Sequence, residues 1–309
     1  MSVLSMETQA AKRPTSRIPL PLKLLFRDPL AASATIFLFI VTLCAIIAPM
    51  LIGDLAEGPN FRARNMAPFS LEQGFAYVLG ADTLGRSLLA RLVVGARNTL
   101  GIAAFAVLCS LLIGGTLGLV AGYSRGWLGN FIMRCTDIVM SFPSLLLALI
   151  VLFSLGPSIQ NLVLVLAITR VPIYLRTTRA EVLEIRERMF VSAATALGAS
   201  HLRLIFTHIA PMVLPTVLTI GAIDFATVVL AESSLSFLGL GIQAPAFTWG
   251  SMVATGRGYL ASAWWVAFWP GLAILLTTLS LNILSSWWRT YSDPHQRWRL
   301  ELAGKRKRK

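Results

Sequence analysis

Two ionisable residues lie inside long apolar stretches of the chain, where a charge is costly. Asp224 is mid-way along the stretch 211–231, and Arg170 is within the stretch 158–176. A charged side chain at membrane depth usually pairs with another charge or faces a water-filled route. Asp224 is therefore expected either to meet a cationic group of a substrate or to pair with a basic residue, for which Arg170 is the candidate. The alternative for Arg170 is that its side chain snorkels to the inner interface.

The motifs of common enzyme and nucleotide-binding sites are missing from the sequence. No G-x-x-x-x-G-K-[ST] phosphate loop occurs, and neither H-E-x-x-H nor G-x-S-x-G is present. The chain is therefore expected to carry no catalytic residue, no metal and no cofactor. The cysteines lack metal-ligand spacing: Cys44, Cys109 and Cys135. His201 and His208 lie seven residues apart on about the same helix face, and docking or solvation explains them better than metal binding.

Membrane-spanning helices must position these residues, because the composition is that of a polytopic membrane protein. The chain has 309 residues, of which 56% are hydrophobic and 13% charged, and its mean hydropathy is +0.72. Soluble domains carry about a quarter charged residues, and one crossing of the bilayer core needs about 20 mainly apolar residues. We expect an all-α fold with six spans, at about 30–52, 99–122, 136–155, 158–176, 211–231 and 267–288.

The fourth span is the least regular of the six, because Arg170 lies within it and Pro172 follows. We retain it since an odd number of spans would place the two basic tails, 1–29 and 289–309, on opposite sides of the membrane. With six spans, 21 of the 27 Lys and Arg residues fall on the side of the tails, and the positive-inside rule makes that side cytoplasmic. The net charge of +13 is then explained by anionic lipids rather than by nucleic acid.

Two segments are expected on the outer side. The region 30–98 holds the first span and an outer segment, in which 79–100 predicts an amphipathic helix along the outer surface, capped by Asp82 or Thr83. The semi-apolar segment 232–265 is too broken by glycine and proline to cross the membrane. It is either a re-entrant element at a pore mouth or a passive outer cap.

Three glycines, Gly114, Gly118 and Gly122, recur at four-residue spacing in the second span. This small-xxx-small pattern lets helices pack backbone to backbone in lipid. Packing within the chain is the simpler interpretation, and a dimer seam is the alternative.

The stretch 190–215, FVSAATALGASHLRLIFTHIAPMVLP, is a polar and small-residue segment between two apolar spans. Glycine and alanine allow a partner to approach the backbone closely, so the stretch predicts a cytoplasmic docking surface. Pro211 and Pro215 follow it, and because proline interrupts a helix, we expect one helix to end and another to start in a new direction. Apolar residues before the prolines recur at helical spacing: Leu202, Ile205 and Ile209.

The sequence resembles a known family over about residues 25–295. This family comprises the inner-membrane permease subunits of ABC importers for dipeptides, oligopeptides and nickel, specifically the C-type component. Four stretches carry the resemblance: LGADTLGRSLLARLVVGAR at 79–97, RCTDIVMSFPSLLLALI at 134–150, AATALGAS with IFTHIAPMVLP within 193–215, and SSLSFLGLGIQAP with WG within 233–250.

The resemblance implies a type I importer permease with its transmembrane core at 99–288, in a bacterial inner membrane. The partners it implies are a homologous second permease, two ATPase subunits that bind ATP and Mg²⁺, and an extracytoplasmic solute-binding protein. Transport would proceed by alternating access, and peptides are the most frequent substrates of such permeases, beside nickel chelates, glutathione, opines and oligosaccharides. The competing class is a self-sufficient channel or secondary transporter, but the sequence shows no repeat of the kind found in such folds.

The resemblance also implies roles for particular residues. The ATPase-docking loop would span about 186–212, with Gly198 the position least tolerant of bulk, and candidate residues that line or gate the pathway are Asp224, Glu232, Phe237 and Arg170. The sequence departs from the family pattern at Ser192, where the loop usually begins with Glu, and at Arg170 and Val171, which replace a small residue and Trp. The docking residues carried over are Ala193, Ala194, Leu197, Gly198, Ala199, Ser200, Ile209, Pro211, Leu214 and Pro215.

Overall fold

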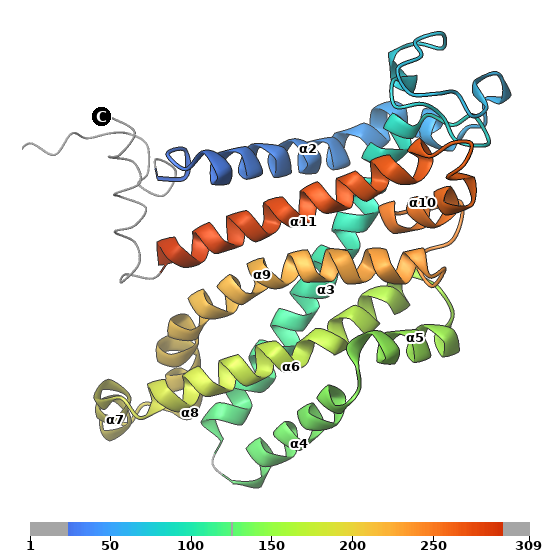
Figure 1. The fold of residues 1–309 in the computed structure, drawn as a ribbon. Helices are drawn as coiled ribbons and strands as arrows, with labels where there is room; N and C mark the ends of the chain where they lie inside the picture. Colours follow the sequence, from blue (N-terminus) through green and yellow to red (C-terminus); the bar gives the residue numbers. More distant parts are fainter. Residues whose placement is uncertain (1–23, 125, 293–309) are drawn as a thin grey trace, which may run out of the picture.

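The computed structural model describes residues 24–124 and 126–292, and these ranges fold into helices joined by turns (Figure 1). No β-strand occurs in the described part. Four short turns are η1 (Phe61–Ala63), η2 (Phe75–Tyr77), η3 (Leu204–Ile209) and η4 (Arg257–Tyr259). The α-helices are α2 (Pro29–Glu57), α3 (Leu88–Tyr123), α4 (Trp127–Ser141), α5 (Ser144–Leu155), α6 (Ile159–Arg186), α7 (Met189–Ala196), α8 (His201–Arg203), α9 (Ala210–Phe237), α10 (Trp249–Gly256) and α11 (Trp265–Ser292).

Five spans in the described ranges are long and apolar enough to cross a membrane, and α4 with α5 makes a sixth if this bent pair counts as one span. The fourth predicted span, with Arg170 and Pro172 inside it, is confirmed as α6. The third, predicted as one helix at 136–155, is instead two helices that meet at 87°. Phe142 is extended at the break (φ −94°, ψ 136°), because the ring of the following Pro143 disfavours helical geometry at the residue before it.

The helix expected to lie along the outer surface at 79–100 does not form as predicted. α3 begins at Leu88 and continues without a break into the second span. Asp82 and Thr83 lie before it in a tight turn, where the Asp82 carboxylate accepts two backbone N–H groups. The cap of α3 is Ser87, whose hydroxyl accepts the N–H of Ala90 at 3.2 Å. Residues 88–100 therefore form the first turns of α3, and not a separate helix on the outer surface.

The three glycines of α3 face α6 within the same chain. A Cβ atom at any of them would lie too close to α6 for normal contact, so the two backbones touch where side chains would otherwise separate them. This confirms packing within the chain rather than a dimer seam. A Cβ atom added to the glycine would lie 2.7 Å from the Cβ of Tyr174 at Gly114, 2.5 Å from that of Thr178 at Gly118 and 2.7 Å from that of Val182 at Gly122.

The prediction that Pro211 and Pro215 end one helix and redirect the next is wrong. α8, η3 and α9 run as one span from His201 to Phe237. η3 is a π-helical turn, closed by the N–H of Ala210 donating to the carbonyl of Ile205. A proline lacks the N–H of an α-helix and its ring clashes with the carbonyl four residues back, and the wider π turn before Pro211 accommodates both effects.

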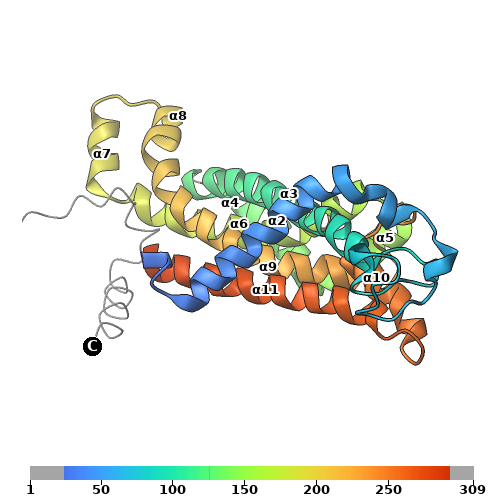
Figure 2. The same cartoon turned by 90° about the horizontal axis from the view of Figure 1, so that it is seen from above.

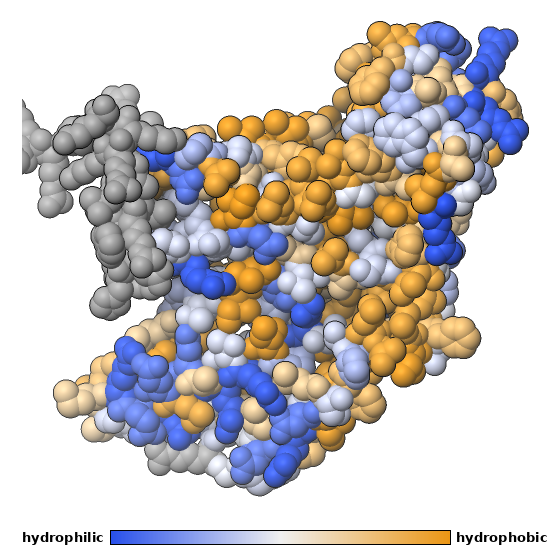
Figure 3. All heavy atoms as spheres, viewed as in Figure 1, coloured by the Kyte–Doolittle hydropathy of each residue, from blue (hydrophilic) through white to orange (hydrophobic). Residues whose placement is uncertain are grey.

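The two ends of the helix bundle differ in what they carry. α7 and α8 project at the end where α2 begins and α11 finishes, whereas residues 58–87 and α10 lie at the other end (Figures 1 and 2). In Figure 3 hydrophobic residues predominate along the upper helices and on the right of the face, and the largest groups of hydrophilic residues lie at the lower left and the upper right. Both described chain ends therefore share a side with the 190–215 segment, as an even number of crossings requires. Most of the predicted tails, with the basic run 305–309, lies outside the described residues.

The contact between α3 and α6 can be tested with two glycines of α3, one against α6 and one with open space around it. We expect Gly118→Leu to destabilise the protein by about 1–3 kcal/mol or more, because the new side chain must separate two touching backbones. Gly115→Leu is the matched control, since nothing lies within 4 Å of a Cβ at that position. Thermal unfolding in detergent measures the effect. Equal melting temperatures for the two variants would contradict the packing described here.

Candidate functional site

The segment between α6 and α9 forms a compact protrusion of two short helices, α7 and α8. α7 ends at Ala196, and Gly198 follows with φ +84°, a left-handed conformation that favours glycine. Ser200 then caps α8 by accepting the N–H of Arg203. Nothing lies within 4 Å of a Cβ placed on Gly198, so the turn offers bare backbone to an approaching surface. The φ angle disfavours other residues at this position, and the prediction that bulk is least tolerated there stays a prediction.

Large apolar side chains are exposed on this protrusion. Met189 and Leu197 are each 88% exposed, and Leu202 and Phe206 are 70% and 66% exposed. Apolar groups gathered at a polar end of the molecule mark a surface that another protein covers. Leu197 was predicted as a docking residue, whereas Met189 and Phe206 were missed. Their signal in the sequence is large apolar residues that flank a small-residue turn.

The ten predicted docking residues do not all lie on this surface. Ala193, Leu197, Gly198 and Ser200 are exposed on the protrusion, with Ala194 and Ala199 half-buried at its base. Ile209 is fully buried in the cluster beneath it, together with Val191 and Leu204. Exposed residues beyond η3 lie along the first turns of α9: Pro211, Leu214 and Pro215.

Asp224 and Arg170 form an ion pair between α9 and α6. The Nε atom of Arg170 is 3.6 Å from Oδ1 of Asp224, and the Tyr174 hydroxyl donates to Oδ2 at 3.2 Å. The Asp224 side chain is 5% exposed and that of Arg170 is 23% exposed. Pairing between helices is thus what the structure shows, rather than snorkelling of Arg170. Tyr174 was not predicted, although it lies one helical turn after Arg170.

Glu232 and Phe237 lie farther along α9, apart from this pair. Glu232 is fully buried, and its carboxylate accepts the hydroxyls of Ser236 at 2.7 Å and Ser233 at 3.3 Å. It faces no open space, so lining a pathway is not the role its surroundings indicate. The guanidinium of Arg257 lies over the Phe237 ring at 5.3 Å. Since Glu232 is eight residues after Asp224, about 12 Å along the helix, the four predicted pathway residues do not form one site.

The outer segment predicted at 232–265 contains the short helix α10, which packs among α3, α9 and α11. Trp249 at its start is 2% exposed. Its indole N–H donates to the Leu92 carbonyl at 2.7 Å, and its backbone N–H donates to the Thr99 hydroxyl at 3.0 Å. The segment is therefore built into the outer end of the bundle and is not a loose cap over it.

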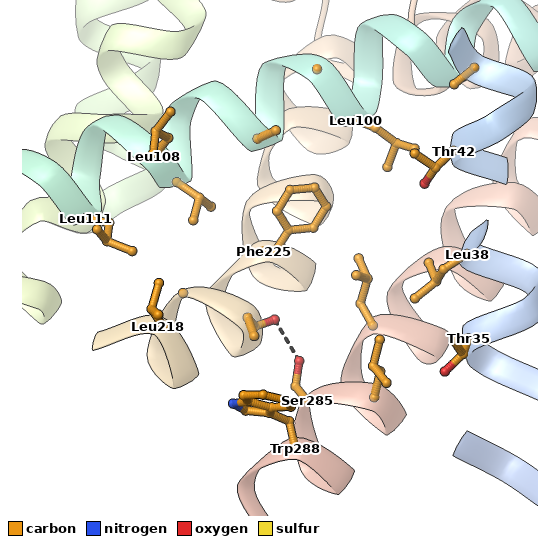
Figure 4. Close-up of a pocket in the computed structure, with 18 of the residues that line it drawn as sticks. Thr35, Leu38, Thr42, Leu100, Leu108, Leu111, Leu218, Phe225, Ser285 and Trp288 are labelled. Carbon is orange, nitrogen blue, oxygen red and sulfur yellow. Dashed lines mark hydrogen bonds between the residues drawn. The ribbon is translucent and has the colours of Figure 1, made fainter. Parts of the chain in front are cut away.

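A cavity of about 1410 Å³ lies between α2, α3, α9 and α11 (Figure 4). Arg97 is the single charged residue among those that line it, and most of the others are apolar. Ser285 at its edge donates to the Ala222 carbonyl at 2.7 Å, so that hydroxyl is already satisfied. None of the four predicted pathway residues lines this cavity. Its lining suits hydrocarbon, because burying charged groups against it would cost several kcal/mol.

Comparison with known proteins places these features in a family. The model of the family described as "Binding-protein-dependent transport system inner membrane component" matches residues 114–298. The chain belongs to this family. The match includes α6, the α7–α8 protrusion and α9, so the elements that hold the candidate docking residues all fall within it.

Similar curated proteins cover nearly the whole chain. The di/tripeptide transport system permease protein DppC of Pseudomonas aeruginosa is 38% identical over 296 residues, 94% of this chain and 97% of the relative. The dipeptide permease protein DppC of Alkalihalophilus pseudofirmus is 39% identical, with 88% of each chain covered. The glutathione transport system permease protein GsiD of Pectobacterium atrosepticum is 34% identical over 87% of this chain and 88% of the relative.

The predicted resemblance is thereby confirmed at the level of family and fold. The chain is a multi-pass inner-membrane permease subunit of a binding-protein-dependent ABC importer, with the helical architecture of that class. It acts with other components of such a transporter. Its relatives are transport permease subunits, which are not themselves enzymes.

The pair between α6 and α9 can be tested by removing one charge and then both. We expect Arg170→Met to destabilise the protein, because it leaves the buried Asp224 carboxylate unpaired. Breaking a buried pair costs about 3–5 kcal/mol, and the partial exposure of Arg170 favours the lower end of this range.

The double variant Arg170→Met, Asp224→Leu should recover part of that loss, since no unpaired charge remains. Unfolding of the four proteins in a double-mutant cycle gives the coupling. Additive losses would show that the two side chains act independently.

Proposed function

We propose that this chain forms one half of the translocation pathway of an ATP-driven importer for di- or oligopeptides. The other half would be a homologous second permease, and the assembly would include two ATPase subunits and an extracytoplasmic solute-binding protein. The names of the similar proteins support a peptide substrate. The glutathione permease among them is compatible with this class, because its named substrate is itself a small peptide. Selection among peptides would rest largely with the binding protein.

The α7–α8 protrusion carries the proposal, because its exposed apolar side chains form a surface that requires a partner. We assign this surface to the ATPase subunits, with Met189, Leu197 and Phe206 entering apolar recesses and Gly198 allowing close approach of the backbone. Ser192, in the place where the family usually has Glu, is exposed and cannot form an ion pair. Docking would therefore depend on shape and apolar contact.

The proposed mechanism is alternating access driven by the partner ATPases, which would bind ATP and Mg²⁺, while this chain would bind no cofactor. The docking loop and both termini would be cytoplasmic, as the distribution of Lys and Arg favours. ATP binding would close the ATPases and move the loop, which would open the pathway between the two permeases outward. The contacts between the ATPase and the loop must differ between the two states of the permease, because a partner that binds both states equally would not shift the equilibrium between them.

Asp224 and Arg170 are the proposed polar element of the pathway wall. Arg170 is partly exposed at membrane depth, and such a side chain faces protein or water rather than lipid. A peptide carries an ammonium and a carboxylate group, so a pair that offers both charges is suited to it. Glu232 and Phe237 would act at the outer end of α9, where Glu232 holds the helix end through its bonded hydroxyls.

Purification of the tagged chain in mild detergent tests the proposed assembly. We expect an ATPase pair and a second permease to accompany it, and we expect Leu197→Asp to lose the ATPase because a charge replaces an exposed apolar contact. Gly198→Trp should also lose or uncouple the ATPase while leaving membrane insertion intact. Phe75→Asp is the matched control, since Phe75 is 75% exposed at the opposite end of the molecule.

The result that would exclude the proposed assembly is a lone or homo-oligomeric chain in stable form. That result would favour a self-sufficient channel or secondary transporter. Normal uptake by the Gly198→Trp variant would contradict the proposal that this loop couples the ATPases to transport.

A further inference from the structure

Three spanning helices meet the docking loop, but the chain connects only two of them to it. α6 leads into α7, and η3 leads into α9. α3 is held by noncovalent contacts alone. Its residues Leu119 and Tyr123 belong to the apolar cluster that contains Val191 and Leu204 of the loop.

The inner end of α3 is attached to the loop by polar contacts at its last two residues. The hydroxyl of Tyr123, the last residue of α3, lies in hydrogen-bond contact with Nδ1 of His201, the first residue of α8, at 2.6 Å. The two rings also meet edge to face, with centroids 5.6 Å apart. Next to this contact, Arg186 at the end of α6 donates to the carbonyl of Gly122 at 2.9 Å.

The outer end of α3 is attached to the segment that contains α10. Asn98 donates to the carbonyl of Phe247 at 2.7 Å, and the guanidinium of Arg91 lies 4.0 Å from the centre of the Phe247 ring. Trp249 adds its two hydrogen bonds to the same face of α3. These polar contacts hold the outer segment to α3, so a movement of α3 would move the outer segment too.

α3 is also the one spanning helix, among the five in the described ranges, that contains no proline. It is a continuous α-helix of 36 residues. A proline lies inside each of the others, at Pro49, Pro172, Pro215 and Pro270. Since prolines are among the usual places where helices bend, α3 lacks a bending point that each of the other four has.

We propose that α3 transmits movement of the docking loop to the α10 segment, and that the contact between Tyr123 and His201 is its inner attachment. The proposal rests on the proposed function, because it takes the ATPase to be the partner that moves the loop. Tyr123 and His201 are positioning residues in this scheme, since neither needs to touch the substrate. The movement arrives at α10 through a helix that is not continuous in sequence with the loop.

The test compares hydrogen exchange in residues 247–256 of the assembled transporter, with and without ATP and vanadate. In the unaltered protein, we expect trapping to change the exchange rate of this segment. Tyr123→Phe keeps the ring but removes the hydroxyl, and it should reduce that change about three- to tenfold, the range expected for one hydrogen bond. ATPase capture and basal ATP hydrolysis should stay within about twofold.

Four further variants, one of them a control, separate transmission from a merely structural role. His201→Phe should reproduce the effect of Tyr123→Phe, and the double variant should be no worse than either one, because both remove the same bond. Asn98→Ala should also reduce the change in exchange of residues 247–256, because it removes a hydrogen bond between the outer end of α3 and Phe247. His208→Phe is the matched control: His208 lies seven residues after His201, and its side chain makes no hydrogen bond to the described residues.

Each outcome decides between the proposals. An unchanged response in Tyr123→Phe and His201→Phe would overturn the role of α3 and leave the ATPase assignment intact. Loss of ATPase capture in Tyr123→Phe, which lies outside the docking loop, would also overturn it, because the contact would then shape the docking surface itself. If the unaltered chain brings no ATPase, both this inference and the proposed function are wrong.

Discussion

The backbone contact between α3 and α6 is the constraint on which the other features depend. In lipid, helices gain little from the hydrophobic effect, so close van der Waals packing must hold them together. Glycine at three positions of α3, spaced four residues apart, allows this approach. It fixes α6 so that Tyr174 and Arg170 meet Asp224 of α9. It also places the last turn of α3 beside the docking loop, where Tyr123 meets His201.

Features that depend on local composition were predictable from the sequence. Apolar stretches of sufficient length gave the spans, including α6 despite its Arg170, because a single charge does not cancel the hydropathy of the whole stretch. The spacing of the glycines predicted close packing of α3 within the chain, and the sequence motifs predicted the family. The sequence also indicated where the protrusion lies, because small and polar residues between two apolar spans favour exposed backbone outside the bundle.

Features that depend on three-dimensional context were not predictable. The rule that proline ends a helix gave a wrong prediction at Pro211. A π turn before Pro211 removes the backbone clash and the missing hydrogen bond that would otherwise have ended the helix. The single helix predicted at 136–155 was wrong for a local reason, since hydropathy does not record the bend at Phe142 and the signal of Pro143 was not used. Arg170 and Asp224 had two alternatives each, and only the fold brings them within 3.6 Å. Ile209 and Leu197 share a motif, but one is buried and the other is 88% exposed.

The length of α3 links the protein to the thickness of its membrane. A helix of 36 residues is about 54 Å long, whereas the hydrocarbon core is about 30 Å thick. Both ends of α3 therefore reach into the headgroup layers or beyond, and its tilt is set by the helices packed against it, α2, α6 and α9. One end contacts the docking loop and the other contacts the α10 segment. A single helix thus makes polar contacts on both sides of the hydrocarbon core.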